Sequence, residues 1–128
     1  MHKILIVEDN KNSRNLMVKL LEKKGGLQAL SAENGFQALI SLQQETDIKV
    51  IILDWEMPEM NGVELLKTIK AMDELSRIPV IMQTANENRK ARLEAIQQGA
   101  FAFITKPIDF ELLHAYIESA IAHIYPKS

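Results

Sequence analysis

Short apolar runs alternate along this chain with longer segments in which apolar residues recur every three or four positions. Four runs stand out, at Ile4–Val7, Val50–Leu53, Val80–Met82 and Ala102–Ile104, and a weaker one spans Leu27–Ala32. The runs are too short for helices. Because they are rich in Val and Ile and apolar at successive positions, they are typical of strands buried on both faces of a parallel sheet.

The segments between these runs have helical spacing. Asp109 is a good N-cap for the last helix, and Asn61 with Glu64 three residues later resembles a capping box at the start of the third. Gly25 and Gly99 stand where the first and fourth helices need a left-handed C-cap. The apolar stripes, helix by helix, are Leu16, Met17, Leu20 and Leu21; Ala38, Leu39 and Leu42; Leu65, Leu66, Ile69 and Met72; Leu93 and Ile96; and Leu113, Tyr116, Ile117, Ala120, Ile121 and Ile124. Five strands alternating with five helices predict an open α/β sandwich with right-handed crossovers.

Composition narrows the class of protein. A length of 128 residues is that of one domain, and 47% hydrophobic with 25% charged residues is the balance of an ordinary globular protein. The absence of cysteine excludes disulfides and thiolate metal sites. No apolar run approaches the roughly 20 residues of a membrane span, and the first run is too short for a signal peptide. We therefore expect a cytoplasmic protein. A net charge of -2 gives no electrostatic attraction to nucleic acid, so we expect no direct contact with it.

Polar residues follow the buried runs at the point where each predicted strand ends. Glu8 and Asp9 follow the first run, Asp54 the second, Thr84 the third and Lys106 the last. In open α/β sheets this edge holds the ligand site, where the strand order reverses. A flavodoxin-like strand order of 2-1-3-4-5 would bring the three carboxylates together. Any one such residue is commonly just a solvated loop residue. Polar residues at five positions that all follow predicted strands, at four strand ends, rarely arise by chance.

Three adjacent carboxylates repel one another unless one is protonated or a cation neutralises them. Oxygen ligands without His or Cys favour a hard ion, Mg2+ or Mn2+, over zinc. Lys106 adds a positive charge, and Thr84 offers a hydroxyl donor. A site that is close to neutral in this way can accept a dianionic phosphoryl group.

Four motifs, in this order and spacing, resemble those of response-regulator receiver domains of two-component signalling systems, including the chemotaxis receivers. They are Ile4–Asp9, Asp54–Gly62, Pro79–Ala85 and Thr105–Pro107. The resemblance covers essentially the whole chain and implies a flavodoxin-like (βα)5 sandwich, with a five-stranded parallel sheet in the order 2-1-3-4-5 flanked by five helices. It implies a single receiver domain over residues 1–128 with no output domain, and a signalling switch that is not an enzyme in its own right. The output would pass to a protein partner or to an output domain on a longer chain.

The resemblance also implies a phosphoacceptor and a set of metal ligands. Asp54 would accept a phosphoryl group from the phosphohistidine of a sensor histidine kinase or a histidine phosphotransfer protein. Asp9, Asp54 and the backbone carbonyl of Glu56 would ligate Mg2+, and Glu8, which replaces the commoner Asp, would hold a water of its shell.

The remaining roles concern the switch. Lys106 would pair with the phosphoryl oxygens, Thr84 would close on them, and Phe103 would change rotamer into the vacated space. The surface of the fourth helix, fifth strand and fifth helix would thereby shift between two arrangements that partners sense. Glu56 and Asn86 would flank the path of the hydrolytic water and modulate the lifetime of the acyl phosphate.

Two other functions stay open. The acid-x-acid spacing of Asp54 and Glu56 is that of haloacid dehalogenase phosphohydrolases, in which an aspartyl phosphate forms and the second acid is a general acid and base. In that family the motif follows the first strand, whereas here it follows the third. An interaction module that no longer depends on phosphorylation is the other alternative, against which the complete set of Asp9, Asp54, Thr84 and Lys106 stands.

Overall fold

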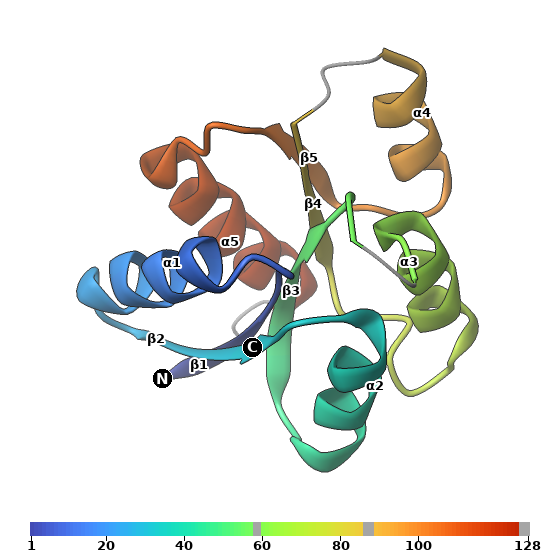
Figure 1. The fold of residues 1–128 in the computed structure, drawn as a ribbon. Coiled ribbons are helices and arrows are strands. Elements are labelled where there is room, and N and C mark those ends of the chain that lie inside the picture. Colours follow the sequence, from blue (N-terminus) through green and yellow to red (C-terminus); the bar gives the residue numbers. More distant parts are fainter. Residues whose placement is uncertain (58–59, 86–88, 126–128) are drawn as a thin grey trace.

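The computed structural model describes residues 1–57, 60–85 and 89–125, and it confirms five strands alternating with five helices (Figure 1). The strands are β1 (His2–Val7), β2 (Leu27–Ala32), β3 (Ile48–Asp54), β4 (Val80–Thr84) and β5 (Ala102–Thr105). The helices are α1 (Lys11–Lys23), α2 (Gly35–Gln44), α3 (Gly62–Ala71), α4 (Arg89–Gln97) and α5 (Phe110–Ile124). All strand pairs are parallel, and their order, β2-β1-β3-β4-β5, is the predicted one.

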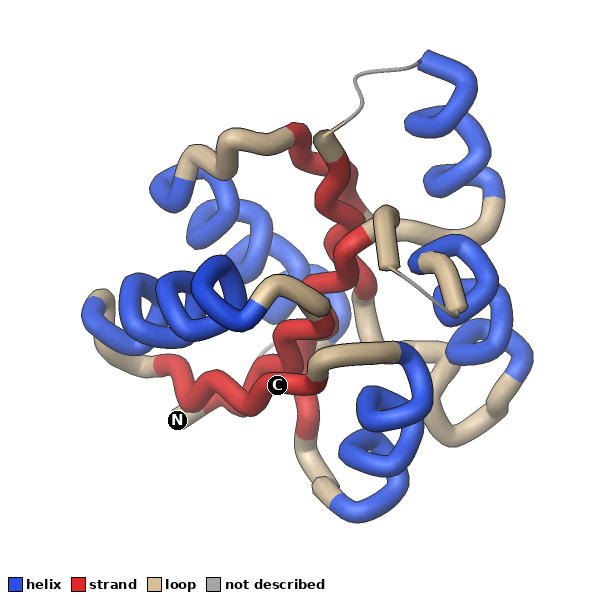
Figure 2. The backbone as a smooth tube through the Cα atoms, in the orientation of Figure 1, coloured by secondary structure: helices blue, strands red, loops and turns tan. Residues whose placement is uncertain are grey.

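The sheet divides the interior into two cores, and successive strand residues alternate between them. Leu5 and Leu53 face the side that α2, α3 and α4 cover, whereas Ile4 and Ile52 face the side of α1 and α5 (Figures 1 and 2). All four side chains are fully buried. Burial on both faces explains why these strands are continuous apolar runs and not alternating ones.

Strand register aligns the carboxyl ends of four strands, β1, β3, β4 and β5. Val7 pairs with Leu53, Asp54 with Gln83, and Thr84 with Thr105. The chain leaves β1 toward β2 on one side and returns to β3 on the other, so the strand order reverses between β1 and β3. The residues directly after these two strands therefore lie at the position where ligands bind in doubly wound folds.

Helix ends follow the predicted capping chemistry. Asn61 Oδ1 accepts a 2.9 Å hydrogen bond from the Glu64 N–H at the start of α3, and Asp109 caps α5 in the same way. Gly25 and Gly99 have φ values of 83° and 102°, as left-handed C-caps require. Gly62, the first residue of α3, has a further reason for being glycine: an added Cβ would lie 2.4 Å from the Asp54 carbonyl oxygen. The α3 terminus thus packs directly on the loop after β3.

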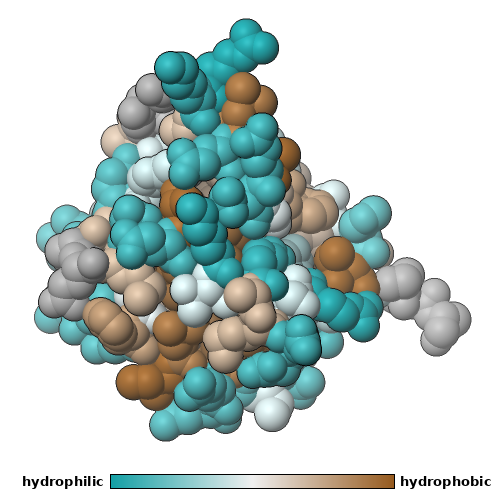
Figure 3. All heavy atoms as spheres, turned by 90° about the vertical axis from the view of Figure 1, so that its right-hand side faces the viewer, coloured by the Kyte–Doolittle hydropathy of each residue, from teal (hydrophilic) through white to brown (hydrophobic). Residues whose placement is uncertain are grey.

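The predicted apolar stripes are wrong at three positions. Leu16, Leu93 and Ile96 are 51%, 49% and 47% exposed, and Ala95 is the buried residue of α4. Because α4 turns Ala95 toward the core, its larger apolar residues Leu93 and Ile96 lie on other sides of the helix. Figure 3 shows the side of the molecule on which α4 lies, where hydrophobic groups form separate patches on a mainly hydrophilic surface.

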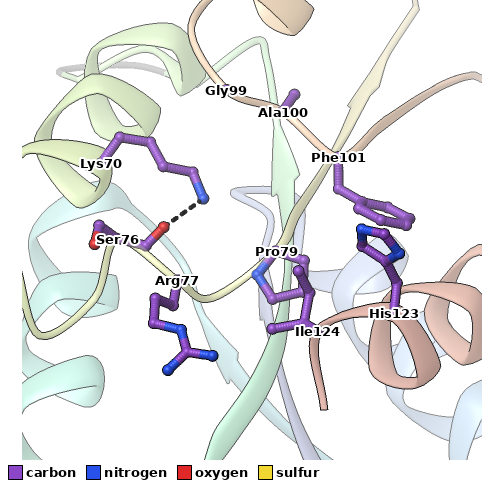
Figure 4. Close-up of a pocket in the computed structure, with 9 residues that line it drawn as sticks. All are labelled: Lys70, Ser76, Arg77, Pro79, Gly99, Ala100, Phe101, His123 and Ile124. Atoms are coloured by element: carbon purple, nitrogen blue, oxygen red, sulfur yellow. Dashed lines mark hydrogen bonds between the residues drawn. The ribbon is translucent and has the colours of Figure 1, made fainter. Parts of the chain in front are cut away.

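A hollow of about 560 Å³ lies at the opposite edge of the sheet, beside the residues that precede β4 and β5 (Figure 4). Lys70 lines it, and its Nζ donates to the carbonyl oxygens of Ser76 at 3.0 Å and Ile78 at 2.9 Å. Burial lowers the pKa of Lys70. Because both hydrogen bonds hold the connection between α3 and β4, we assign Lys70 a structural role.

None of the described helices is long and apolar enough to cross a membrane.

Candidate functional site

Three of the predicted site residues meet at the carboxyl edge of the sheet. Glu8 directly follows β1, and Asp54 is the last residue of β3. Both residues are 1% exposed. The Lys106 ammonium, which follows β5, lies 3.1 Å from Asp54 Oδ1 and 3.4 Å from Glu8 Oε1. One cation therefore bridges two buried carboxylates.

Asp9 completes an acidic cluster. One carboxylate oxygen from each of Glu8, Asp9 and Asp54 lies within 4.8 Å of the others, although the Asp9 side chain is exposed. The turn that carries the two acids is held by Arg14, whose Nη1 donates to the Glu8 carbonyl oxygen at 2.8 Å, and by the Asn10 N–H, which donates to Glu8 Oε2 at 3.2 Å. The predicted convergence of the three carboxylates is confirmed.

The charges of this cluster are not balanced by protein groups. Burial, with the adjacent Glu8, raises the pKa of Asp54 to about 8, and Lys106 offsets only part of this effect. For Glu8, burial opposes ionisation, but hydrogen bonds from Asp54 and the Asn10 N–H and the charge of Lys106 lower its pKa overall. At neutral pH one proton thus remains between the two buried acids.

A divalent cation would remove the need for that proton. The donor atoms are all carboxylate oxygens, the ligand type that Mg2+ and Mn2+ prefer. Burial and the adjacent Glu8 together disfavour an ionised Asp54, and the charge of such an ion would offset both effects. The residues therefore fit a hard divalent ion.

Glu56 lies at the surface beside this cluster, and its side chain turns toward the end of β4. Its Oε1 accepts hydrogen bonds from the Thr84 hydroxyl and, at 3.2 Å, from the Ala85 N–H. Its own N–H donates to Asp54 Oδ1 at 3.3 Å. These hydrogen bonds outweigh the effect of partial burial and lower the pKa of Glu56. Sequence reasoning named Glu56 and Thr84 but missed their contact and the part of Ala85.

Phe103 is buried under the same edge. It is 9% exposed, with its ring centroid 6.2 Å from that of Trp55 in an edge-to-face arrangement. The Arg92 guanidinium on α4 lies 5.4 Å from the ring centroid. The aromatic side chain thus contacts both the loop after Asp54 and the helix after Thr84. Asn86 lies outside the residues that the structure describes.

Residues 4–118 match the family described as the response regulator receiver domain. The chain belongs to this family. Among curated relatives, a chemotaxis protein CheY homolog of Campylobacter jejuni is 34% identical over 119 residues, which are 93% of this chain and 92% of the relative. The chemotaxis protein CheY-3 of Vibrio cholerae is 40% identical over 105 residues, 82% of this chain and 80% of the relative.

A solved receiver domain from Clostridium thermocellum has the same fold. It superposes with a TM-score of 0.87 at 27% identity, covering 96% of each chain. The present chain therefore combines the flavodoxin-like fold of its family with an acidic cluster that could hold a metal ion. Receiver domains are components of two-component signal transduction, which is the functional class of this chain.

Proposed function

We propose that this receiver domain is a phosphorylation-activated switch in which Asp54 accepts a phosphoryl group from the phosphohistidine of a sensor kinase or histidine phosphotransfer protein. The supporting observation is the buried Asp54 carboxylate, bridged to Glu8 by the Lys106 ammonium at the carboxyl edge of the sheet. A carboxylate buried at this edge has no evident structural role and has the chemistry of a phosphoacceptor.

Asp9, Asp54 and the backbone carbonyl of Glu56 would hold Mg2+, or Mn2+ in its place, with Glu8 beside them. The ion supplies charge that neutralises the carboxylates and the phosphoryl oxygens. Its presence would leave Asp54 ionised and nucleophilic, a state that burial and Glu8 disfavour in the protein alone. Lys106, already 3.1 Å from Asp54 Oδ1, is positioned to pair with a phosphoryl oxygen once transfer has occurred.

The signal would pass from Thr84 to the surface formed by α4, β5 and α5. Thr84 ends β4, and the chain leads from it into α4, whose Arg92 lies over the Phe103 ring. A Thr84 side chain that moves toward the phosphoryl group would draw this connection inward and give Phe103 a different space to fill. A protein partner, or an output domain on a longer chain, would bind one of the two arrangements.

The phosphohydrolase alternative requires Glu56 to act as a general acid and base. Its carboxylate instead accepts hydrogen bonds from Thr84 and Ala85 and has a lowered pKa, which suits a hydrogen-bond acceptor better than a proton donor. The structure thus favours the switch.

The test is phosphorylation by acetyl phosphate in the presence of Mg2+. Intact mass should show one added phosphoryl group on the wild-type protein and none on Asp54→Asn. Asp73→Asn, which changes an exposed acid away from the cluster, is the matched control and should be modified like wild type. A phosphoryl group on Asp54→Asn at the wild-type rate would show that the acceptor is another residue.

A further inference from the structure

The Glu56 carboxylate contacts two hydrogen-bond donors at the end of β4. A single Glu56 oxygen, Oε1, accepts hydrogen bonds from both the Thr84 hydroxyl and the Ala85 N–H. Two donors that converge on one oxygen define one place where negative charge is stabilised. In this structure the protein's own carboxylate occupies that place.

We propose that Glu56 is an internal latch: before phosphorylation its carboxylate engages the two donors, Thr84 and Ala85, that a phosphoryl group on Asp54 needs. The proposal rests on the proposed function of Asp54, and it assigns Glu56 a positioning role that is distinct from an effect on the hydrolytic water. Phosphorylation would then be an exchange, in which phosphoryl oxygens replace the Glu56 carboxylate at the Thr84 and Ala85 donors.

The chain geometry makes the two acceptors compete for the same donors. Glu56 is two residues after Asp54, and its N–H donates to Asp54 Oδ1 at 3.3 Å, which holds the backbone of Glu56 at the acceptor carboxylate. The side chain reaches the end of β4 from there. A phosphoryl group attached to Asp54 starts from the same point and carries oxygens of the same charge. Thr84 and Ala85 cannot donate fully to both acceptors with these single hydrogen atoms.

The latch has a consequence for affinity. Because the donors already have an anionic acceptor, the phosphoryl group gains only the difference between two charge-assisted hydrogen-bond sets. Glu56→Ala removes the competitor and should strengthen binding of a phosphoryl mimic. Hydrogen bonds to charged groups contribute enough for a change of about tenfold, taken at the low end because the Glu56 side chain is exposed. Glu56→Gln keeps an acceptor without the charge and should give a smaller increase.

The probe is beryllofluoride, a stable mimic of the phosphoryl group on a carboxylate, titrated at saturating Mg2+ with Trp55 fluorescence as the signal. The variants are wild type, Glu56→Ala, Glu56→Gln and Glu74→Gln. The last removes an exposed acid distant from the cluster and should bind like wild type. Equal affinity of Glu56→Ala and wild type would overturn the latch.

A double-mutant cycle with Thr84→Ala separates the latch from simple repulsion between Glu56 and the mimic. If Glu56 acts through the Thr84 donor, the gain from Glu56→Ala should fall to about threefold or less in the Thr84→Ala background, because only Ala85 remains to be released. If the full gain persists, Glu56 acts by charge alone and the latch is wrong.

The Ala85 amide provides a readout without any ion or mimic. Its NMR resonance in the ion-free protein should shift in Glu56→Ala and not in Glu74→Gln, because the N–H loses a carboxylate acceptor. An unmoved resonance would contradict the latch contact itself. A wild-type protein that binds no beryllofluoride at Asp54, but whose Ala85 amide responds as described, would instead contradict the proposed phosphoacceptor.

Discussion

Replacing Asp54 by Asn should stabilise the ion-free protein increasingly as the pH rises. In the folded state burial, with the neighbouring Glu8, raises the pKa of Asp54 from 3.8 to about 8. Between these two values the folded protein holds a proton that the unfolded chain has released. The free energy of unfolding of wild type therefore falls as the pH increases, whereas an Asn at this position cannot titrate.

The magnitude follows from one proton. A difference of one bound proton changes the free energy of unfolding by about 1.4 kcal/mol per pH unit. Glu8 has a lowered pKa in the folded state and an ordinary value of 4.5 in the unfolded chain, so it is largely ionised in both states above pH 5 and adds only a small slope near the lower end of this range. From pH 5 to pH 7 wild type should thus lose up to about 3 kcal/mol relative to Asp54→Asn, a large part of the 5–15 kcal/mol that is typical of a domain.

The assay is urea unfolding in EDTA at pH 5, 6 and 7, followed by the fluorescence of Trp55, the single tryptophan. The other titrating groups are common to both proteins, so the difference between them reports the loss of Asp54 together with its effect on the adjacent Glu8. Mg2+ should then stabilise wild type more than the variant, because an ion that binds only the folded state adds to its stability. Parallel pH dependences of wild type and Asp54→Asn would refute the reasoning.

Three further predictions concern neighbouring residues. Lys106→Ala should retain Mg2+ binding, measured by Trp55 fluorescence, but lose most phosphotransfer or switching; weaker Mg2+ binding with normal transfer would contradict the role of Lys106. Glu56→Asn should shorten the phosphorylated lifetime in a single-turnover decay, whereas Asn86→Ala should change it less, and an unchanged or longer lifetime for Glu56→Asn would refute this role. Gly62→Ala should destabilise the protein by roughly 1–3 kcal/mol in urea unfolding because its Cβ meets backbone. Gly35→Ala, whose Cβ meets the end of a flexible methionine, should cost less, and an equal cost would show that the loop after β3 yields easily.

The sheet and the edge that carries the chemistry could be predicted from the sequence because both follow from local patterns. Strands buried on both faces must be apolar at successive positions, as Ile4–Val7 and Val50–Leu53 are. A charged residue directly after such a run, as at Asp54, then marks a strand end at which charge is tolerated. Parallel pairing brings these strand ends to one edge of the sheet. To predict that Glu8, Asp9 and Asp54 lie together there, only the strand order had to be assumed as well.

Only the tertiary structure decided which apolar residues of a helix are buried and which side chains meet at the carboxyl edge of the sheet. Leu93 and Ile96 have helical spacing but are exposed, because α4 packs on the core through Ala95 and the rotation of a helix about its axis is set by tertiary packing. The contact of Glu56 with Thr84 joins residues 28 positions apart in the chain. Spacing along the sequence indicates that both lie near the site, but a flexible glutamate has several rotamers that reach different partners. The hydrogen-bond donors at the end of β4 select among them, and these donors are brought to Glu56 only when β3 and β4 pair.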